Sequence, residues 1–246
     1  MNLRVLIVDD EDLGRAVLRE LLAPLPGVEI VGEARNGFEA VKAAEELRPN
    51  LLLLDIHMPK LSGFEVLELL REPVETIFVT AHDDHALRAF EVHAVDYLLK
   101  PVEPERLAVA LERARTRLER GQALPAAAEL AESARPPGSV VERILIREEG
   151  QIHILAVGKI DYVEAKDDYL AFHADKKVFK KQQTLSALEQ QLDGRRFVRI
   201  HRSYLLNLDR LAGLDLYAKD SWVARLQDGS RLPVSRSGHA RLQELL

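Results

Sequence analysis

Three aspartates, Asp9, Asp10 and Asp55, are the residues of this chain whose type and spacing could do chemistry. The pair directly follows the mainly apolar run Arg4–Val8, and Asp55 directly follows Leu51–Leu54. If these runs are neighbouring strands of a parallel sheet, their carboxyl ends bring the three carboxylates together, about 5 Å apart between strands. Carboxylates this close repel one another, and a hard cation such as Mg²⁺ relieves the repulsion while leaving room for phosphate oxygens.

Two residues that follow later apolar runs could assist a phosphoryl transfer. Thr80 can donate its hydroxyl to a phosphoryl oxygen, and Lys100 can lean across two strand spacings, about 10 Å, to offer its ammonium group. A carboxylate nucleophile, a metal ion and two electrophilic groups are what transfer of a phosphoryl group to an aspartate needs. Taken singly, each of these residues is more often a turn, cap or structural residue, so the argument rests on their joint placement at strand ends.

Five strand–helix units must position these residues. Apolar runs alternate with segments of helical period over residues 1–118, and Leu51–Leu54 is apolar without alternation, as a strand covered on both faces is. Ser62 and Glu65 form a capping-box pattern, and Pro104 suits the first turn of a last helix. This alternation predicts an α/β domain with a parallel sheet between two layers of helices. The expected strands are Arg4–Val8, Glu29–Gly32, Leu51–Leu54, Thr76–Val79 and Val95–Leu98.

These segments together resemble the receiver domain of two-component response regulators, over about residues 2–118. The resemblance rests on Val8–Glu11, Leu54–Pro59, Val79–Ala81 and Asp96–Pro101. It implies a flavodoxin-like fold, a five-stranded parallel sheet in the order 2-1-3-4-5. It also implies that Asp55 is the phosphoacceptor of a sensor histidine kinase and that the protein forms a homodimer on phosphorylation.

The same resemblance implies the remaining roles in the receiver. Mg²⁺ would be held by Asp9, Asp10, Asp55 and the backbone carbonyl of His57, with Asp9 acting through water. Thr80 and Tyr97 would form the switch pair that reports phosphorylation, and the Lys100–Pro101 peptide bond would be cis. We therefore expect no enzyme but a phosphoacceptor that assists its own Mg²⁺-dependent phosphoryl transfer, with Lys100 helping.

A segment rich in alanine and proline, residues 119–138, reads as a linker between two parts of unlike charge. Residues 1–118 carry a net charge of −8, and residues 139–246 carry +3. The two parts are expected to have different partners, although a surplus of three positive charges is weak support for nucleic acid binding.

The chain has no cysteine, which excludes disulfides, thiolate metal sites and a cysteine nucleophile. With no apolar run of about 20 residues and no secretory signal, we expect a cytoplasmic protein without a membrane partner.

Short alternating strands follow the linker. Glu148–Gly150 has turn composition between two such strands, Ser186–Leu192 has helical spacing with Ser186 and Glu189 as a capping box, and a short last helix runs to Leu246. The pattern predicts a mainly antiparallel β domain over residues 139–246. The expected strands are Ile144–Arg147, Gln151–Leu155, Ile160–Glu164, Tyr169–His173, Phe197–Ile200, Tyr204–Leu208, Trp222–Leu226 and Arg231–Val234.

Basic residues of this second part cluster near turns rather than on a helix that could enter a DNA groove. The lysine cluster is Lys176, Lys177, Lys180 and Lys181. It is expected to be a solvated sheet edge that deters pairing with other sheets. Arginines near the turn after Phe197–Ile200 could bind phosphates or guanine bases.

Two segments, Ile160–Leu170 and Phe197–Asn207, closely resemble the LytTR family of β-type DNA-binding domains, and Leu232–Arg236 extends the match over about residues 140–246. Three loops of that family meet DNA. Carried over to this chain, the DNA-binding residues are Lys166, Asp168, His201, Arg202 and Arg236. Because the family often has an amide where Asp168 stands, this carboxylate could instead accept a hydrogen bond from a cytosine amino group. His201 could equally be a structural histidine packed by Tyr204.

The sequence thus predicts a transcription factor that is phosphorylated on Asp55, dimerises and binds repeated DNA sites. The alternative is a phosphorylation-controlled signalling adaptor whose β module binds protein, because the charge is mild and Asp167–Asp168 is acidic. An aspartyl-phosphate phosphatase is disfavoured, since no second acidic residue stands two positions after Asp55. The segment His82–His85 is expected to be a polar loop rather than a metal site.

Overall fold

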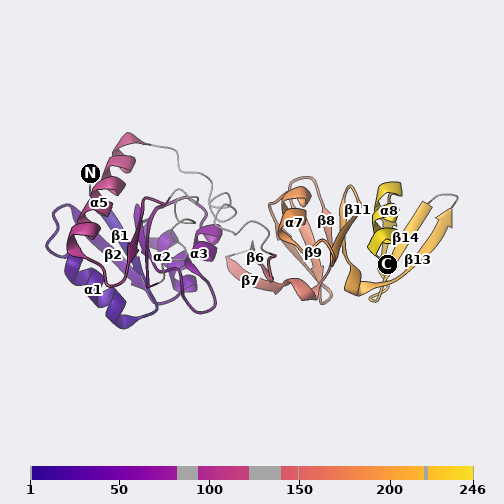
Figure 1. Cartoon of the computed structure of the whole chain (residues 1–246), viewed down its shortest axis with the longest axis horizontal. Coiled ribbons are helices and arrows are strands. Elements are labelled where there is room, and N and C mark those ends of the chain that lie inside the picture. Colours follow the sequence, from indigo (N-terminus) through magenta and orange to yellow (C-terminus); the bar gives the residue numbers. More distant parts are fainter. Residues whose placement is uncertain (1, 82–93, 122–139, 149, 219–220, 246) are drawn as a thin grey trace. The chain divides into compact units, whose positions relative to one another are not determined.

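The computed structural model describes residues 2–81, 94–121, 140–148, 150–218 and 221–245. The chain divides into two compact units, Met1–Pro137 and Gly138–Leu246 (Figure 1). Most of the expected linker, residues 122–138, and the whole His82–His85 segment lie outside the described residues.

A five-stranded parallel sheet in the order β2-β1-β3-β4-β5 forms the centre of the first unit, as predicted. Each expected strand is present, β3 with the expected bounds and the others with ends shifted by at most two residues. The elements are β1 (Leu3–Val8), α1 (Asp12–Leu22), β2 (Val28–Ala34), α2 (Gly37–Leu47), β3 (Leu51–Leu54), α3 (Gly63–Leu69), β4 (Glu75–Thr80), β5 (Asp96–Leu99) and α5 (Pro104–Arg120).

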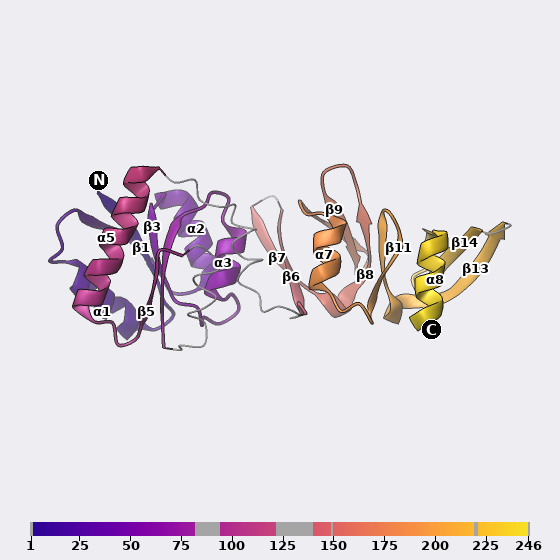
Figure 2. The ribbon, with the colours of Figure 1, turned by 45° about the horizontal axis from the view of Figure 1, so that its top comes forward.

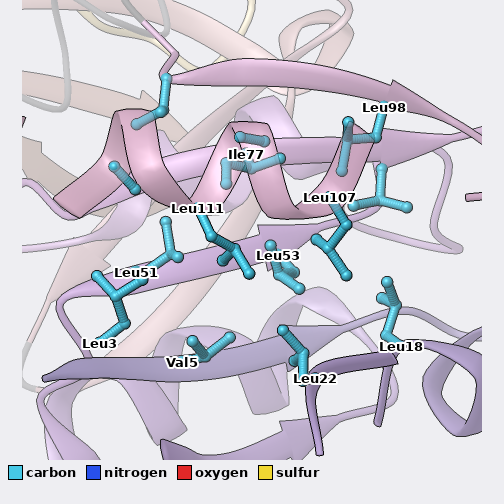
Figure 3. Close-up of a cluster of buried hydrophobic side chains, with 14 of the residues drawn as sticks. Leu3, Val5, Leu18, Leu22, Leu51, Leu53, Ile77, Leu98, Leu107 and Leu111 are labelled. Atoms are coloured by element: carbon cyan, nitrogen blue, oxygen red, sulfur yellow. The ribbon is translucent and has the colours of Figure 1, made fainter. Parts of the chain in front are cut away.

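Helices cover both faces of this sheet, with α1 and α5 on one face and α2 and α3 on the other (Figures 1 and 2). Alternate residues of each strand serve the two faces: Leu53 of β3 packs with Leu18 of α1 and Leu111 of α5, as Figure 3 shows. On the other face Phe78 of β4 meets Phe64 of α3, with ring centroids 4.9 Å apart. All of Leu51–Leu54 is therefore buried, and the absence of alternation in the sequence has this physical cause.

Local signals set the helix ends as expected. Ser62 and Glu65 form a complete capping box at the start of α3, and Pro104 occupies the first turn of α5. Gly121 ends α5 in the left-handed conformation. The Lys100–Pro101 peptide bond is cis, which confirms that expectation.

The second unit is built from antiparallel sheets, which confirms the predicted class. A central sheet has the order β10-β9-β8-β12-β11, a second has β13-β14-β15, and a hairpin pairs β6 with β7. The elements are β6 (Arg143–Glu148), β7 (Gln151–Ala156), the 3₁₀ turn η1 (Val157–Lys159), β8 (Ile160–Ala165), β9 (Leu170–Ala174), β10 (Lys177–Lys181), α7 (Leu185–Gln191), β11 (Phe197–His201), β12 (Tyr204–Asn207), the 3₁₀ turn η2 (Leu208–Arg210), β13 (Leu211–Ala218), β14 (Ser221–Leu226), β15 (Arg231–Val234) and α8 (Arg236–Leu245).

Two hydrophobic clusters cover the two faces of the central sheet. Phe197 of β11 and Leu205 of β12 belong to the cluster that includes β6, β7 and α7. Their neighbours Val198 and Leu206 belong to the other cluster, with β14, β15 and α8. The sheet is thus covered on both faces. The loops and turns at its ends are therefore the places to look for a binding site.

The structure corrects one helix start and adds two strands. The cap of α7 is Thr184, whose hydroxyl accepts from Ala187 N, and not Ser186 as predicted. Ser186 instead accepts a hydrogen bond from Arg199. The expected strands did not include β10 or β13, although the lysine cluster on β10 was expected to lie at a sheet edge. Lysine, which is depleted in strands, fills three of the five positions of β10, and β13 contains glycine and alanine, so the strand signal of each composition is weak.

We predict that Leu53→Ala destabilises the first unit by about 2–5 kcal/mol, because a fully buried leucine leaves a cavity that its neighbours fill only in part. Leu13→Ala is the control, since Leu13 is 75% exposed. Urea unfolding by circular dichroism measures the loss. Fluorescence of Trp222, the single tryptophan, follows the second unit and should not change. An equal loss in the free energy of unfolding for Leu53→Ala and Leu13→Ala would contradict the packing of Leu53 in the core of the first unit.

Candidate functional site

The carboxyl ends of β1 and β3 bring the three aspartates together, as the strand order requires. One ligand oxygen from each of Asp9, Asp10 and Asp55 lies within 4.8 Å of the other two. Asp9 and Asp55 are 1% and 4% exposed, respectively. Backbone pairing fixes both, because Asp9 N donates to Ala34 O and Asp55 N donates to Val8 O. The sheet ladder therefore continues one residue past each strand and holds the acids in place.

Asp55 is held on three sides. Its Oδ1 accepts from the backbone N–H of His57 at 3.1 Å, and its Oδ2 accepts from Lys100 Nζ at 2.7 Å. Gly63, the first residue of α3, lies directly against its backbone. A side-chain carbon at Gly63 would come 2.5 Å from the Asp55 carbonyl oxygen, so this close approach requires glycine.

The ammonium group of Lys100 bridges the acidic group. Besides Asp55, its Nζ lies 2.8 Å from Asp9 Oδ2 and 3.4 Å from Glu11 Oε2. Burial alone would lower the pKa of Lys100, but its hydrogen bonds and ion pairs with Asp55 and Asp9 outweigh burial and raise the pKa above its usual value. Lys100 is therefore a permanent cation at the site.

Asp9 bears an electrostatic cost for its negative charge at this buried position. Burial raises its pKa, and the contacts with Lys100 and with the N–H of Glu11 oppose that rise only in part. Its Oδ2 is buried and, apart from the ion pair with Lys100, has no hydrogen-bond partner. A buried oxygen of this kind fits a metal ligand, and ligand oxygens of octahedral Mg²⁺ lie roughly 3–4 Å apart. The donor set thus suits Mg²⁺.

The two expected switch residues lie on β4 and β5. Thr80 ends β4, is fully buried, and has its hydroxyl 3.4 Å from Nδ1 of His57, the residue two positions after Asp55. Tyr97 lies further back on β5, paired with Phe78, and is 9% exposed. Thr80 therefore belongs to the acidic site, whereas Tyr97 lies behind it in the sheet.

In the second unit, two of the expected DNA-binding segments lie at one end of the central sheet. The loop after β8 carries Lys166 and Asp168, and the turn between β11 and β12 carries Arg202. The strands β8 and β12 are paired, and Ala165 N donates to Ser203 O, which joins the loop to the turn. Lys166, Asp168 and Arg202 are exposed there.

The third expected segment is attached to the same end. Ser235 donates from its N–H and from its hydroxyl to the carbonyl of Ile200, two residues before Arg202. Gly238 of α8 packs on that carbonyl so closely that a side-chain carbon would come 2.0 Å from it. Arg236, exposed at the start of α8, is thus anchored to the end of β11.

Arg199 shapes the turn that presents Arg202, a role that our sequence analysis did not assign. Its guanidinium donates to the carbonyl of Arg202 at 3.1 Å and pairs with Glu189 of α7 at 3.4 Å. Arg241 of α8 also pairs with Glu189 and donates to the carbonyl of Arg199. These contacts with α7, α8 and the Arg202 carbonyl are tertiary, so local sequence patterns do not reveal the link between Arg199 and the turn.

Two other expected DNA contacts have partners within the protein. Glu164 accepts from Lys166 and from the Tyr204 hydroxyl, and burial together with this bond raises the pKa of Tyr204 to about 12. His201 accepts a hydrogen bond from Ser203 N and lies beside Tyr204, with ring centroids 5.8 Å apart. The structural role that we considered for His201 is therefore present.

Comparisons with known proteins match both units. The response regulator receiver domain family matches residues 5–112, and the LytTr DNA-binding domain family matches residues 150–246. Among the residues described, no helix is both long and apolar enough to cross a membrane.

Two similar proteins match nearly the whole chain, and a solved structure matches the first unit. The sensory transduction protein LytT of Enterococcus faecalis is 36% identical over 247 residues, covering 99% of each chain. The transcriptional regulatory protein BtsR of Escherichia coli is 34% identical over 249 residues, also covering 99% of each chain. A solved response regulatory domain of protein mrkE from Klebsiella pneumoniae is 32% identical, with 48% of this chain and 98% of that chain covered and a TM-score of 0.44.

We predict that Asp9→Asn stabilises the first unit at neutral pH in Mg²⁺-free buffer. Because the folded pKa of Asp9 is raised, the folded state bears a cost for the charged form at neutral pH, and protonation removes that cost at acidic pH. The gain over the wild type should therefore shrink as the pH falls through the raised pKa. Urea unfolding at a series of pH values measures it.

In the same assay, Mg²⁺ at 100 times its dissociation constant should stabilise the wild type by about 2.7 kcal/mol and leave Asp9→Asn unchanged. Equal stabilisation of the variant would rule out Asp9 as part of the metal site. A loss of stability on substitution without Mg²⁺ would show that the contact with Lys100 outweighs burial.

Proposed function

This chain belongs to the response regulators that join a receiver domain to a LytTR DNA-binding domain, and on that basis we propose that phosphorylation of Asp55 controls its binding to DNA. A protein with these two domains is a two-component transcriptional regulator. We assign the receiver to residues 1–118, the linker to residues 119–138 and the DNA-binding domain to residues 139–246.

The observation that carries the proposal is the buried Asp55 carboxylate with a lysine ammonium 2.7 Å away and a second buried acid beside it. A structural ion pair needs only one acid for each lysine. The surplus negative charge of Asp9 and Asp10 has no structural benefit, because like charges repel. It does suit a site where Mg²⁺ neutralises the acids and the phosphoryl oxygens when it is bound.

In the transfer, an oxygen of Asp55 forms the new bond to phosphorus. The bond from phosphorus to the histidine nitrogen of the sensor kinase breaks, and the nitrogen leaves with the bonding electron pair. Lys100 then exchanges its contact with Asp55 for one with a phosphoryl oxygen, and Thr80 donates its hydroxyl to another. Asp9, Asp10 and the His57 carbonyl would complete the metal site. The chain accepts one phosphoryl group and so acts as an acceptor rather than a turnover enzyme.

The switch would act through β4 and β5. A phosphoryl group on Asp55 draws the Thr80 hydroxyl toward it, and the space that this opens changes the packing around Tyr97. Two apolar side chains on the nearby surface, Leu99 of β5 and Val109 of α5, are 47% and 46% exposed. We propose that this surface forms the homodimer, because exposed apolar groups of this kind gain from burial.

The dimer would place two DNA-binding domains on a repeated site. Once one domain is bound, the effective concentration of the other at the second half of the site is high, and this raises the affinity of the dimer for DNA. Arg202 and Arg236 are the arginines best suited to guanine, because both are exposed at one end of a rigid sheet. Lys166 would bind phosphate, and Asp168 is suited to a cytosine amino group. The match to a DNA-binding family favours DNA over a protein partner for this domain.

We predict that Asp55→Asn abolishes phosphate uptake from acetyl phosphate with Mg²⁺, because the amide lacks a nucleophilic carboxylate oxygen. Intact-mass spectrometry measures the uptake, and sedimentation measures the dimer that should form with the wild type only. The control is Asp12→Asn, since the Asp12 side chain is 90% exposed at the start of α1. Uptake by Asp55→Asn at the wild-type level would rule out Asp55 as the phosphoacceptor.

We predict that Arg202→Ala lowers the preference for the specific DNA site by about 1–3 kcal/mol, as expected for one arginine that grips a guanine. The target is first recovered by selecting bound genomic fragments with phosphorylated wild-type protein. Arg195→Ala is the matched control. Arg195 is also an exposed arginine, but it lies just before the first residue of β11, whereas Arg202 follows the last residue of that strand. An unchanged site profile for Arg202→Ala would contradict base recognition by this residue.

A further inference from the structure

The lysine cluster, Lys176, Lys177, Lys180 and Lys181, lies on and beside β10, the terminal strand of the central sheet. As an edge strand rich in lysine it matches the expected solvated edge. The register, however, divides the cluster in two. Lys181 pairs with Leu170, at the end of the sheet where the loop with Lys166 begins, whereas Lys177 pairs with Ala174 at the opposite end.

Lys180 lies in one row with the proposed DNA-binding turn. It pairs with Ala171 of β9, which pairs with Glu164 of β8, which pairs with Tyr204 of β12, which pairs with His201 of β11. Four strand spacings of about 4.8 Å place Lys180 roughly 19 Å from the turn across the sheet. At this end of the sheet, cationic side chains therefore lie on both edge strands: Lys180 on β10 and Arg202 in the turn after β11.

A direct contact ties Lys180 to the loop between these edges. Its ammonium lies 5.4 Å from the ring centroid of Tyr169, and the carbonyl of Tyr169 accepts from Lys166 N. Through Tyr169, the loop that carries Lys166 is thus in contact with Lys180 of β10. This cation–π contact orients Lys180 toward the loop without neutralising its charge.

We infer that Lys180 and Lys181 bind DNA phosphates and extend the DNA-binding surface from the arginines at β11 to the edge strand β10. A phosphate backbone that crosses this end of the sheet meets Arg202 and Arg236 at one side, Lys166 in the middle and the two lysines at the other. Lysine suits this place because an ammonium binds phosphate as a point charge and reads no base. Lys176 and Lys177, at the opposite end, take no part.

This inference rests on the proposed DNA binding, and the experiment separates the two. Full-length phosphorylated protein is titrated with a duplex bearing the motif recovered by the genomic selection and with a scrambled duplex, over a series of salt concentrations. The variants are Lys180→Ala/Lys181→Ala and the matched pair Lys176→Ala/Lys177→Ala. Both pairs remove two positive charges from β10 or from the turn before it, so the net charge changes equally.

For the first pair, the slope of log affinity against log salt should fall by about 1–2 on both duplexes, because each lost phosphate contact removes about 0.9. The second pair should leave the slope within about 0.5 of the wild type. Lys180→Arg/Lys181→Arg should restore the slope, since arginine also binds phosphate. Equal slopes for the two alanine pairs would overturn the inference, whether both change or neither does.

Failure of the proposed function gives a different result. If wild-type protein binds both duplexes alike and Arg202→Ala changes nothing, sequence-specific DNA binding itself fails. If the wild type and Arg202→Ala behave as predicted while the alanine pairs do not differ, only the role of Lys180 and Lys181 fails.

Discussion

The contact of Lys100 with Asp9 and Asp55 is the interaction on which the receiver site depends. Two acids that are almost fully buried stand at adjacent strand ends, and one ammonium lies within 2.8 Å of both. Its positive charge offsets the repulsion between the two carboxylates. The site therefore holds an electrostatic conflict, the mutual repulsion of buried carboxylates, which a divalent cation would relieve.

The DNA-binding domain solves a different problem, since it must present loop residues rigidly. Pairing of β8 with β12 joins the Lys166 loop to the turn, and the carbonyl of Ile200 holds the start of α8. Arg199 then fixes the backbone of the turn at the Arg202 carbonyl. Each of these segments is hydrogen-bonded through its backbone within the domain, so the proposed binding of phosphates would require little further ordering of the chain.

Much of this protein could be predicted from local sequence signals. The continuous run Leu51–Leu54 indicated a covered parallel strand, and the capping box at Ser62 marked a helix start, because each depends on a few neighbouring residues. The strand order came from the resemblance to receivers, and with it the meeting of Asp9, Asp10 and Asp55 could be expected. Strand β13 and the cap at Thr184 escaped prediction, since glycine and alanine weaken the strand signal of β13 and Ser186 imitates a cap equally well.

The amino-acid sequence by itself determined the class of each domain, the order of the elements and the types of residue available at the strand ends. Tertiary structure decided which of them act together. It placed the Lys100 ammonium on two acids far away in the chain, linked Arg199 to the turn through α7 and α8, and divided four similar lysines between two ends of one strand. Periodicity reveals which face of an element is buried, but only the pairing register and the packing of distant elements bring particular side chains within reach of one another.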